Sequence, residues 1–496
     1  MRLASGKTTF FDYREVAPGR ATRDMYILPN GKLDPEASTI GYKSVAVPGT
    51  VAGLELVLKT YGTMKLADVM APAIRLAEEG FTVSPKLAAE LAEERKDLQR
   101  FSVSRRIFLK NGEMYHAGEA IKQPELAATL KRIAKSGAAE FYRGETAHTL
   151  VDDMARLGGL ITMEDLANYQ PRVREPLHAH YELDGHKWDV LAAPPPSSGG
   201  VAVIEALNML DGVQLKNWDD AQSVHIMAEV MRRVFADRAA YLADPDFAKV
   251  PVDGLTSPCY AKELRATIDA ARASSSKTIQ AGQPHVCGTE ARISTPQEIS
   301  SNDGPHTTHF SVVDAAGNAV ASTYTLNDSY GSHATSRAGF LLNDEMDDFT
   351  TQPGVPNALF GLIQSEANAI APGHRPLSSM TPTILVRDGK LSFVTGSPGG
   401  PRIISAVLLS VVNWMKLGFD AQTAINAPRF HHQWFPDRIM LENQISPTVQ
   451  RALEAMGHTT RKIGHIGLVN AIGIDVTTGE RLGAADPRDE GSAVGY

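Results

Sequence analysis

Apolar and polar residues alternate most regularly just past the middle of the chain. Over residues 308–313, successive side chains fall on opposite faces of a strand, so Phe310 and Val312 share one face and His309 lies on the other. The turn signal Gly317-Asn318 separates this run from a second one, rich in small and β-branched residues. We predict a β-hairpin over residues 306–327.

Helical spacing of apolar residues is clearest over residues 220–243, where the apolar face ends at Asp244-Pro245. The same spacing predicts helices within residues 50–100, 118–136, 144–157 and 403–414. Strands are predicted over residues 8–13, within 168–191, and as a second hairpin over 381–396 around the turn Asp388-Gly389. Alternating strands and helices are consistent with a mixed α and β fold.

The segment before the first hairpin, residues 272–306, is rich in Ser, Gly, Pro and Thr and has no sustained period, which is typical of an exposed loop. Cleavage between His306 and Thr307 would expose an N-terminal threonine. Its hydroxyl would be a nucleophile, and its α-amino group, with a pKa near ~7.7–8.0, would be the base. Because that nitrogen is an amide in the intact chain, cleavage would create the catalyst.

Bulk composition narrows the class of protein. Of the 496 residues, 43% are apolar and 21% are charged, which fits a folded protein with a sizeable core. The formal charge, 49 − 57 = −8, argues against a nucleic-acid partner. No apolar run approaches the roughly 18 residues needed to cross a membrane, and no nucleotide-binding signature stands in its strand–helix context.

Cysteine and histidine positions give little sign of a metal. Cys259 and Cys287 are too few for a disulfide framework or a structural zinc site, and we favour two thiols over a pair, which leaves the redox compartment open. The adjacent His431 and His432 cannot share one face of a strand or helix, so a structural role is favoured.

Short motifs occur along nearly the whole chain: DYREVAP (12–18), PGTVAG (48–53), PPPSSGG (194–200), RPLSSM (375–380), GSPGG (396–400) and NAPRFHH (426–432). Together with the hairpin after Thr307 and the acidic stretch 341–349, they resemble the γ-glutamyltranspeptidases, a family of N-terminal-nucleophile hydrolases. The number and order of the motifs carry this resemblance.

The resemblance implies an α+β fold, a four-layer αββα sandwich. It implies autocleavage into a large fragment, residues 1–306, and a small fragment, residues 307–496, which stay together. It implies no metal and no organic cofactor, and a periplasmic or extracellular location. Family members carry a helical region and a glycine-rich strand ahead of the first motif, so we expect an N-terminally short large fragment here.

The resemblance also assigns a role to each candidate site residue. Thr307 would attack the substrate, Thr325 would orient it, and the N–H groups of Gly399 and Gly400 would stabilise the oxyanion. The substrate α-carboxylate would bind Arg14, Ser378 and Ser379. The α-ammonium would bind Asn327, Glu345 and Asp348. On the residues alone, the favoured interpretation is a solvated acidic turn for Asp347-Asp348 and an ordinary loop for Ser378-Ser379.

The implied reaction transfers a γ-glutamyl group from a donor such as glutathione to water, an amino acid or a dipeptide. The segment 354–372 resembles the lid of bacterial members, with Phe360 nearest the place where many have a tyrosine. One alternative is a cephalosporin-type acylase, whose nucleophile is usually serine. Another is an uncleaved, inactive chain that serves as a binding protein.

Overall fold

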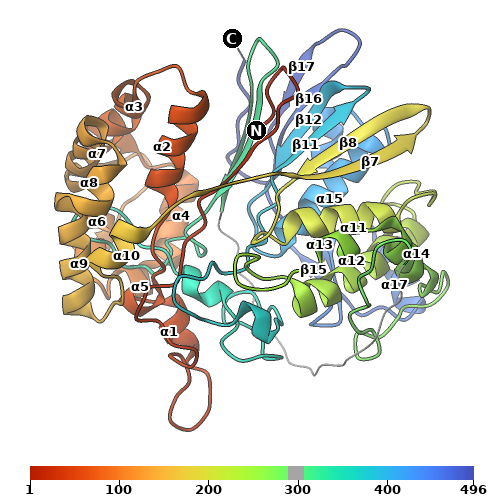
Figure 1. The fold of residues 1–496 in the computed structure, drawn as a ribbon, viewed down its shortest axis with the longest axis horizontal. Coiled ribbons are helices and arrows are strands. Elements are labelled where there is room, and N and C mark those ends of the chain that lie inside the picture. The colour runs from red at the N-terminus through yellow and green to blue at the C-terminus, as the bar shows by residue number, and fades with distance from the viewer. Residues whose placement is uncertain (289–306, 496) are drawn as a thin grey trace.

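A computed structural model of the protein describes residues 1–288 and 307–495 (Figure 1). Much of the predicted linker, including His306, lies outside the described residues. At the centre is an antiparallel sheet with the strand order β17-β16-β12-β11-β8-β7. Its strands are β7 (Leu177–Leu183), β8 (His186–Ala192), β11 (Thr383–Arg387), β12 (Lys390–Gly396), β16 (Asn470–Ile474) and β17 (Arg481–Ala484).

The central sheet joins distant parts of the sequence. β11 and β12 form the hairpin predicted over residues 381–396, and Asp388 and Gly389 both have positive φ, +50° and +78°, as a two-residue primed turn requires. β8 pairs with β11, so that Leu191 lies opposite Ile384. Backbone hydrogen bonds therefore connect the part of the chain before the predicted cut to the part after it.

Helices cover one face of the sheet (Figure 1). α11 (Gly199–Met209) and α15 (Arg402–Met415) pack directly on the sheet. α12 (Ala221–Tyr241) and α14 (Pro258–Ala266) pack on α11, and α17 (Pro447–Ala455) packs on α12. α12 is the helix predicted over residues 220–243, and its N-cap Asp220 accepts the N–H of Ser223 at 3.0 Å. It is buried on nearly all sides and carries five buried charged residues: Glu229, Arg232, Arg233, Asp237 and Arg238.

The other face of the sheet is covered by the first hairpin, β9 (Thr308–Val313) and β10 (Ala319–Tyr324). The polar side of β9 faces the sheet, whereas Phe310 and Val312 are 44% and 49% exposed. His309 packs so closely on Gly396 of β12 that a Cβ there would overlap its ring. Ser311 donates to the carbonyl of Asn470 on β16 at 3.1 Å. In the described chain this hairpin forms a two-stranded sheet of its own.

A separate helical unit lies beside the sheet and has two apolar cores of its own (Figure 1). It contains the helices predicted within residues 50–100, 118–136 and 144–157. The predicted helices are α2 (Thr50–Tyr61), α3 (Leu66–Glu79), α4 (Pro85–Glu93), α5 (Arg95–Leu98), α7 (Pro124–Ser136) and α9 (Glu145–Leu157). The unit also contains three helices outside the predicted ranges, α6 (Ser102–Phe108), α8 (Ala138–Arg143) and α10 (Met163–Asn168). Strand β1 (Phe10–Asp12) pairs with β6 (Arg172–Arg174). None of the helices in the described ranges is long and apolar enough to cross a bilayer.

Shorter elements complete the chain. They are α1 (Pro35–Thr39), η1 (Tyr42–Ser44), β2 (Phe81–Thr82), β3 (Leu109–Lys110), β4 (Glu113–Met114), β5 (Ala120–Ile121), α13 (Val252–Leu255), η2 (Glu345–Asp348), η3 (Glu366–Asn368), α16 (Ala421–Asn426), β13 (Phe430–His431), β14 (Ile439–Glu442) and β15 (Thr460–Ile463).

The two cysteines form a disulfide, with their Cα atoms 5.4 Å apart, so the expectation of two thiols is wrong. The bond fastens the first half of the predicted linker, at Cys287, to α14. Cysteines 28 positions apart carry no local signal of pairing, because only the tertiary fold brings them together.

Candidate active site

Thr307 lies directly before β9, and the register of the hairpin determines its neighbour. Thr308 pairs with Tyr324, so the next position outward places Thr307 beside Thr325. Thr307 Oγ1 donates to Thr325 Oγ1 at 3.1 Å, a contact that agrees with the orienting role implied by the resemblance. Both side chains line a cleft of about 800 Å³.

The residues after β10 hold Thr325 in place. The backbone N–H of Asn327 donates to Thr325 Oγ1 at 2.9 Å, and Asn327 has a positive φ of +80°. The Asn327 amide nitrogen donates to the carbonyl of Asp344 at 3.3 Å. Asn327 is therefore next to the Thr307–Thr325 pair, with its side-chain donor turned toward the acidic segment.

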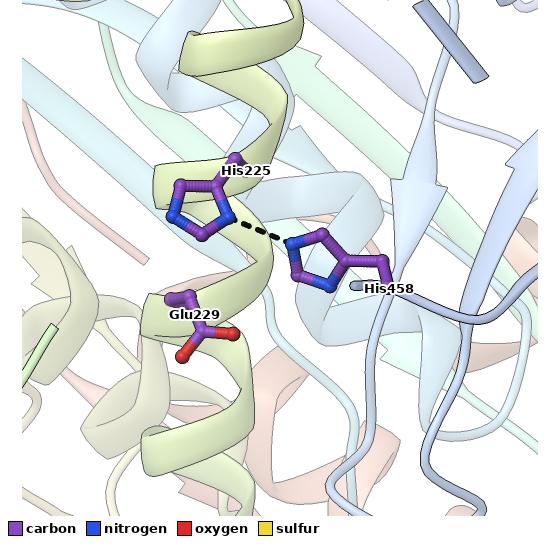
Figure 2. Close-up of side chains that lie close together, drawn as sticks. All are labelled: His225, Glu229 and His458. Atoms are coloured by element: carbon purple, nitrogen blue, oxygen red, sulfur yellow. Dashed lines mark hydrogen bonds between the residues drawn. The ribbon is translucent and has the colours of Figure 1, made fainter. Parts of the chain in front are cut away.

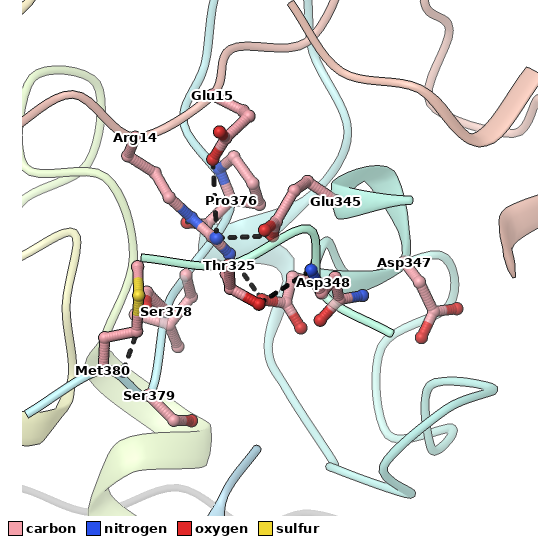
Figure 3. A network of polar contacts seen from close by, with 12 residues as sticks. Arg14, Glu15, Thr325, Glu345, Asp347, Asp348, Pro376, Ser378, Ser379 and Met380 are labelled. Atoms are coloured by element: carbon pink, nitrogen blue, oxygen red, sulfur yellow. Dashed lines mark hydrogen bonds and ion pairs between the residues drawn. The ribbon is translucent and has the colours of Figure 1, made fainter. Parts of the chain in front are cut away.

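Arg14 is the centre of a buried charged cluster (Figure 3). It follows β1, is 5% exposed, and donates through Nη1 to Glu345 and through Nη2 to Asp348. Its Nε donates to the carbonyl of Pro376 at 3.1 Å, and Glu15 lies 3.7 Å from Nη1. The resemblance assigns Arg14 to the carboxylate of a ligand and assigns Glu345 and Asp348 to its ammonium group. In the structure, Arg14 pairs with these two acidic residues directly.

Burial and charge oppose one another in this cluster. Burial alone would lower the pKa of Arg14, but Glu345 and Asp348 raise it above its usual value. Burial raises the pKa of Glu345 and Asp348 despite the nearby guanidinium, and raises that of Glu15 to about 7. Arg238 also lies close enough to Asp348 to lower its pKa, so three buried carboxyl groups face two guanidinium groups here.

The short helix η2 separates the roles of the acidic residues. Glu345 and Asp348 are three apart on a 3₁₀ turn, so their side chains project from the same side toward Arg14. Asp347 points away from them (Figure 3). It accepts from Ser38 at 2.7 Å and from the backbone N–H of Leu359 at 3.0 Å. Asp347 therefore anchors the predicted lid segment.

The serine pair lies near the same cluster. Ser378 lines a second, smaller cavity of about 190 Å³ together with Arg14, and Thr325 lines both this cavity and the larger cleft. Ser379 Oγ accepts from Arg238 Nη2 at 3.1 Å, and Ser198 Oγ accepts from Arg238 Nε at 3.0 Å. Burial lowers the pKa of Arg238 to about 10. Sequence reasoning missed this second guanidinium, because it lies on a helix recognised by its apolar face.

Gly399 and Gly400 form the connection between β12 and α15. Gly399 lines the cleft that contains Thr307. Both glycines have positive φ, +133° and +55°, which side chains disfavour. A Cβ on Gly400 would also lie 2.5 Å from the ring of Phe360 in the predicted lid. Backbone amides just ahead of a helix N-terminus are well suited to an anion.

A family model supplies the decisive comparison. The model described as gamma-glutamyltranspeptidase matches residues 1–496. The chain belongs to the γ-glutamyltranspeptidase family. One relative in this family, the glutathione hydrolase proenzyme of Escherichia coli (strain K12), is 42% identical over 492 residues, covering 98% of this chain and 81% of the relative.

Solved structures of a cephalosporin acylase and of a γ-glutamyltranspeptidase share the fold. The cephalosporin acylase from Bacillus halodurans superposes with a TM-score of 0.83 at 26% identity, covering 99% of this chain and 85% of that one. The γ-glutamyltranspeptidase of Helicobacter pylori matches with a TM-score of 0.55 at 39% identity, covering 58% of this chain and 83% of that one. These neighbours confirm the predicted α+β class of the family.

Proposed function

We propose that this family member is a γ-glutamyl transferase and glutathione hydrolase whose nucleophile is Thr307. The observation that carries the proposal is the contact between Thr307 and Thr325 in a cleft shared with Gly399. A nucleophile, an orienting hydroxyl and candidate oxyanion donors are thereby gathered at one place. The buried Arg14 cluster lies on the other side of Thr325.

Maturation would use the same hydroxyl. Thr307 Oγ1 attacks the carbonyl carbon of residue 306, the amide becomes an ester, and water hydrolyses that ester. The products are the fragments 1–306 and 307–496, with a free α-amino group on Thr307. At neutral pH that amine can accept a proton from its own hydroxyl.

In turnover, Thr307 Oγ1 forms a bond to the γ-carbonyl carbon of the donor while the α-amine takes the hydroxyl proton. The N–H groups of Gly399 and Gly400 stabilise the oxyanion. The C–N bond then breaks, and the proton passes to the leaving amine, which is cysteinylglycine when the donor is glutathione. Water, an amino acid or a dipeptide resolves the γ-glutamyl ester. No metal or organic cofactor takes part in these steps.

The site would bind both charged groups of the donor, its α-carboxylate and its α-ammonium. Arg14, Ser378 and Ser379 would hold the α-carboxylate. Glu345, Asp348 and Asn327 would surround the α-ammonium. The excess of carboxyl groups in the cluster supports this assignment, because an ammonium group would offset the negative charge that Arg14 alone does not balance. By likeness to the relatives we place the enzyme in the periplasm or outside the cell.

The similarity to a cephalosporin acylase makes acylase activity the second candidate. A glutaryl amide and a γ-glutamyl amide differ in the α-ammonium alone, so the pair isolates the contribution of Glu345 and Asp348. We expect γ-glutamyl-4-nitroanilide to be turned over at least about tenfold faster in kcat/KM than glutaryl-4-nitroanilide, since the lost contact is worth more than about 1.4 kcal/mol. Equal rates for both would favour the acylase.

Cleavage is tested by intact-mass spectrometry of the wild type beside Thr307→Ala, with Thr308→Ala as the matched neighbour. We expect two fragments split before Thr307 in the wild type and in Thr308→Ala, and one chain in Thr307→Ala. A single uncut wild-type chain with no anilide hydrolysis would refute the enzyme proposal and favour a non-catalytic binding protein.

A further inference from the structure

Three buried side chains outside the candidate active site have the chemistry of metal ligands (Figure 2). His225 and Glu229 lie one turn apart on α12 and project from the same face. His458 follows α17 and meets them from the opposite side. One potential ligand atom from each residue lies within 4.8 Å of the other two, and exposures of 0%, 0% and 5% exclude bulk water.

The hydrogen bonds of His225 determine which of its nitrogens is free for a ligand. Nε2 lies 2.8 Å from the backbone carbonyl of Asp269. Because a carbonyl only accepts, Nε2 carries the proton, and Nδ1 presents a lone pair toward His458. A carbonyl that holds the far nitrogen of an imidazole is the usual support of a metal-binding histidine.

His458 can become the second histidine ligand at the cost of a single hydrogen bond. Its Nε2 lies 2.7 Å from His225 Nδ1, and its Nδ1 has no hydrogen-bond partner within the described part of the chain. Moving the proton to Nδ1 therefore costs only the bond between the two histidines.

Glu229 supplies a carboxylate oxygen. Arg232 Nε and the backbone N–H of Ser274 donate to its Oε1 at 3.3 and 3.1 Å. Its Oε2 accepts from Arg233 at 2.7 Å. Arg232 also pairs with Asp437, so the formal charges of Glu229, Asp437 and the two arginines cancel. The pocket is therefore electrostatically neutral rather than repulsive to a cation.

We propose that His225, Glu229 and His458 bind one divalent transition-metal ion of the zinc class. Two imidazole nitrogens and one carboxylate oxygen form a common protein ligand set for Zn²⁺, with a fourth position for water. His225 and Glu229 precede the predicted cut, whereas His458 follows it. The ion is thus a structural link between the two fragments and takes no part in the reaction at Thr307.

The test measures the metal itself. The purified protein is stripped with a chelator, incubated with Zn²⁺, freed of excess by gel filtration and analysed by mass spectrometry of the elements. We expect about one Zn²⁺ per chain in the wild type and its loss in His458→Gln, whose amide nitrogen can still donate to His225. The control His180→Gln removes an exposed histidine that contacts Asp189 at 2.6 Å, and should retain the metal.

Two further readouts keep the test decisive. Co²⁺ in the wild-type site should give the visible absorption of a four-coordinate N and O environment, and the variant should not. Zn²⁺ should raise the thermal unfolding midpoint of the wild type alone. His225→Gln replaces His458→Gln if circular dichroism shows that the latter is unfolded. Wild-type protein that retains no more Zn²⁺ than the folded variant would overturn the proposal.

Discussion

Replacing Arg14 with glutamine tests the electrostatics of the buried cluster directly. Arg14 is 5% exposed and contacts Glu345 and Asp348, so its loss leaves two carboxyl groups without their cation. Removing one partner of a buried ion pair costs about 3–5 kcal/mol, because the other charge remains buried. We expect the free energy of unfolding to fall by that amount at neutral pH.

Arg23→Gln is the matched control. Arg23 contacts Glu366 at 2.7 Å, but the two side chains are 35% and 66% exposed. An exposed pair contributes about 0.2–1 kcal/mol, because water and salt screen it. The two variants remove the same group, so the difference between them, at least about 2 kcal/mol, measures the effect of burial.

Urea unfolding followed by circular dichroism measures both losses, in a Thr307→Ala background so that a single uncut chain unfolds. In the cleaved enzyme, Arg14→Gln should also raise KM for the γ-glutamyl anilide, because the α-carboxylate loses its bidentate partner. Equal, small stability losses in Arg14→Gln and Arg23→Gln would refute the reasoning. They would mean that the carboxyl groups are already neutralised by protons, so that Arg14 holds no net ion pair.

Three other predictions follow from single contacts. Gly400→Ala places a side chain at φ +55° and 2.5 Å from the ring of Phe360, so the proposed oxyanion donors should shift and kcat should fall about 10²–10³-fold. Adding Phe360→Ala should restore part of kcat. An unchanged kcat in Gly400→Ala would contradict the role proposed for Gly400. Burial raises the pKa of Glu15 to about 7, so the folded state keeps a proton that the unfolded state releases above pH 4.5. The free energy of unfolding should therefore decline as the pH rises from 4.5 to 7. Urea titrations of Glu15→Gln should show a flatter decline. Cys287→Ser opens a loop of 28 residues and should lower the free energy of unfolding by about 3–4 kcal/mol. The reduced wild type should lose a similar amount, and Cys259→Ser should lose at least as much.

Local signals accounted for most of the elements that position the site. The turn Asp388-Gly389 determines the second hairpin, and Asp220 with the apolar face of α12 determines that helix. The pairing of Thr307 with Thr325 follows from the register of a hairpin whose turn is visible in the sequence. These predictions depend on neighbours within about 20 residues, where turn chemistry and period are sufficient.

Features that depend on distant residues could not be predicted. His309 faces inward and Phe310 outward because Gly396, far along the chain, leaves room for an imidazole. Arg14 binds Glu345 and Asp348 across more than 300 positions. Arg238 reaches Ser379 from a helix that periodicity identifies only as core. Burial of polar groups is decided by their partners, which no local pattern reveals.

The pairing of β8 with β11 bears on whether folding or cleavage of the chain must come first. If the chain is cut before Thr307, four strands of the central sheet belong to one fragment and two to the other. Pieces synthesised apart would each present an unpaired strand edge, at which chains aggregate. Only a continuous polypeptide keeps the two edges at high effective concentration while they find each other. If the chain is cut there, the linker would serve to bring the two edges together, and covalent continuity would matter for folding and no longer be needed once the sheet has formed.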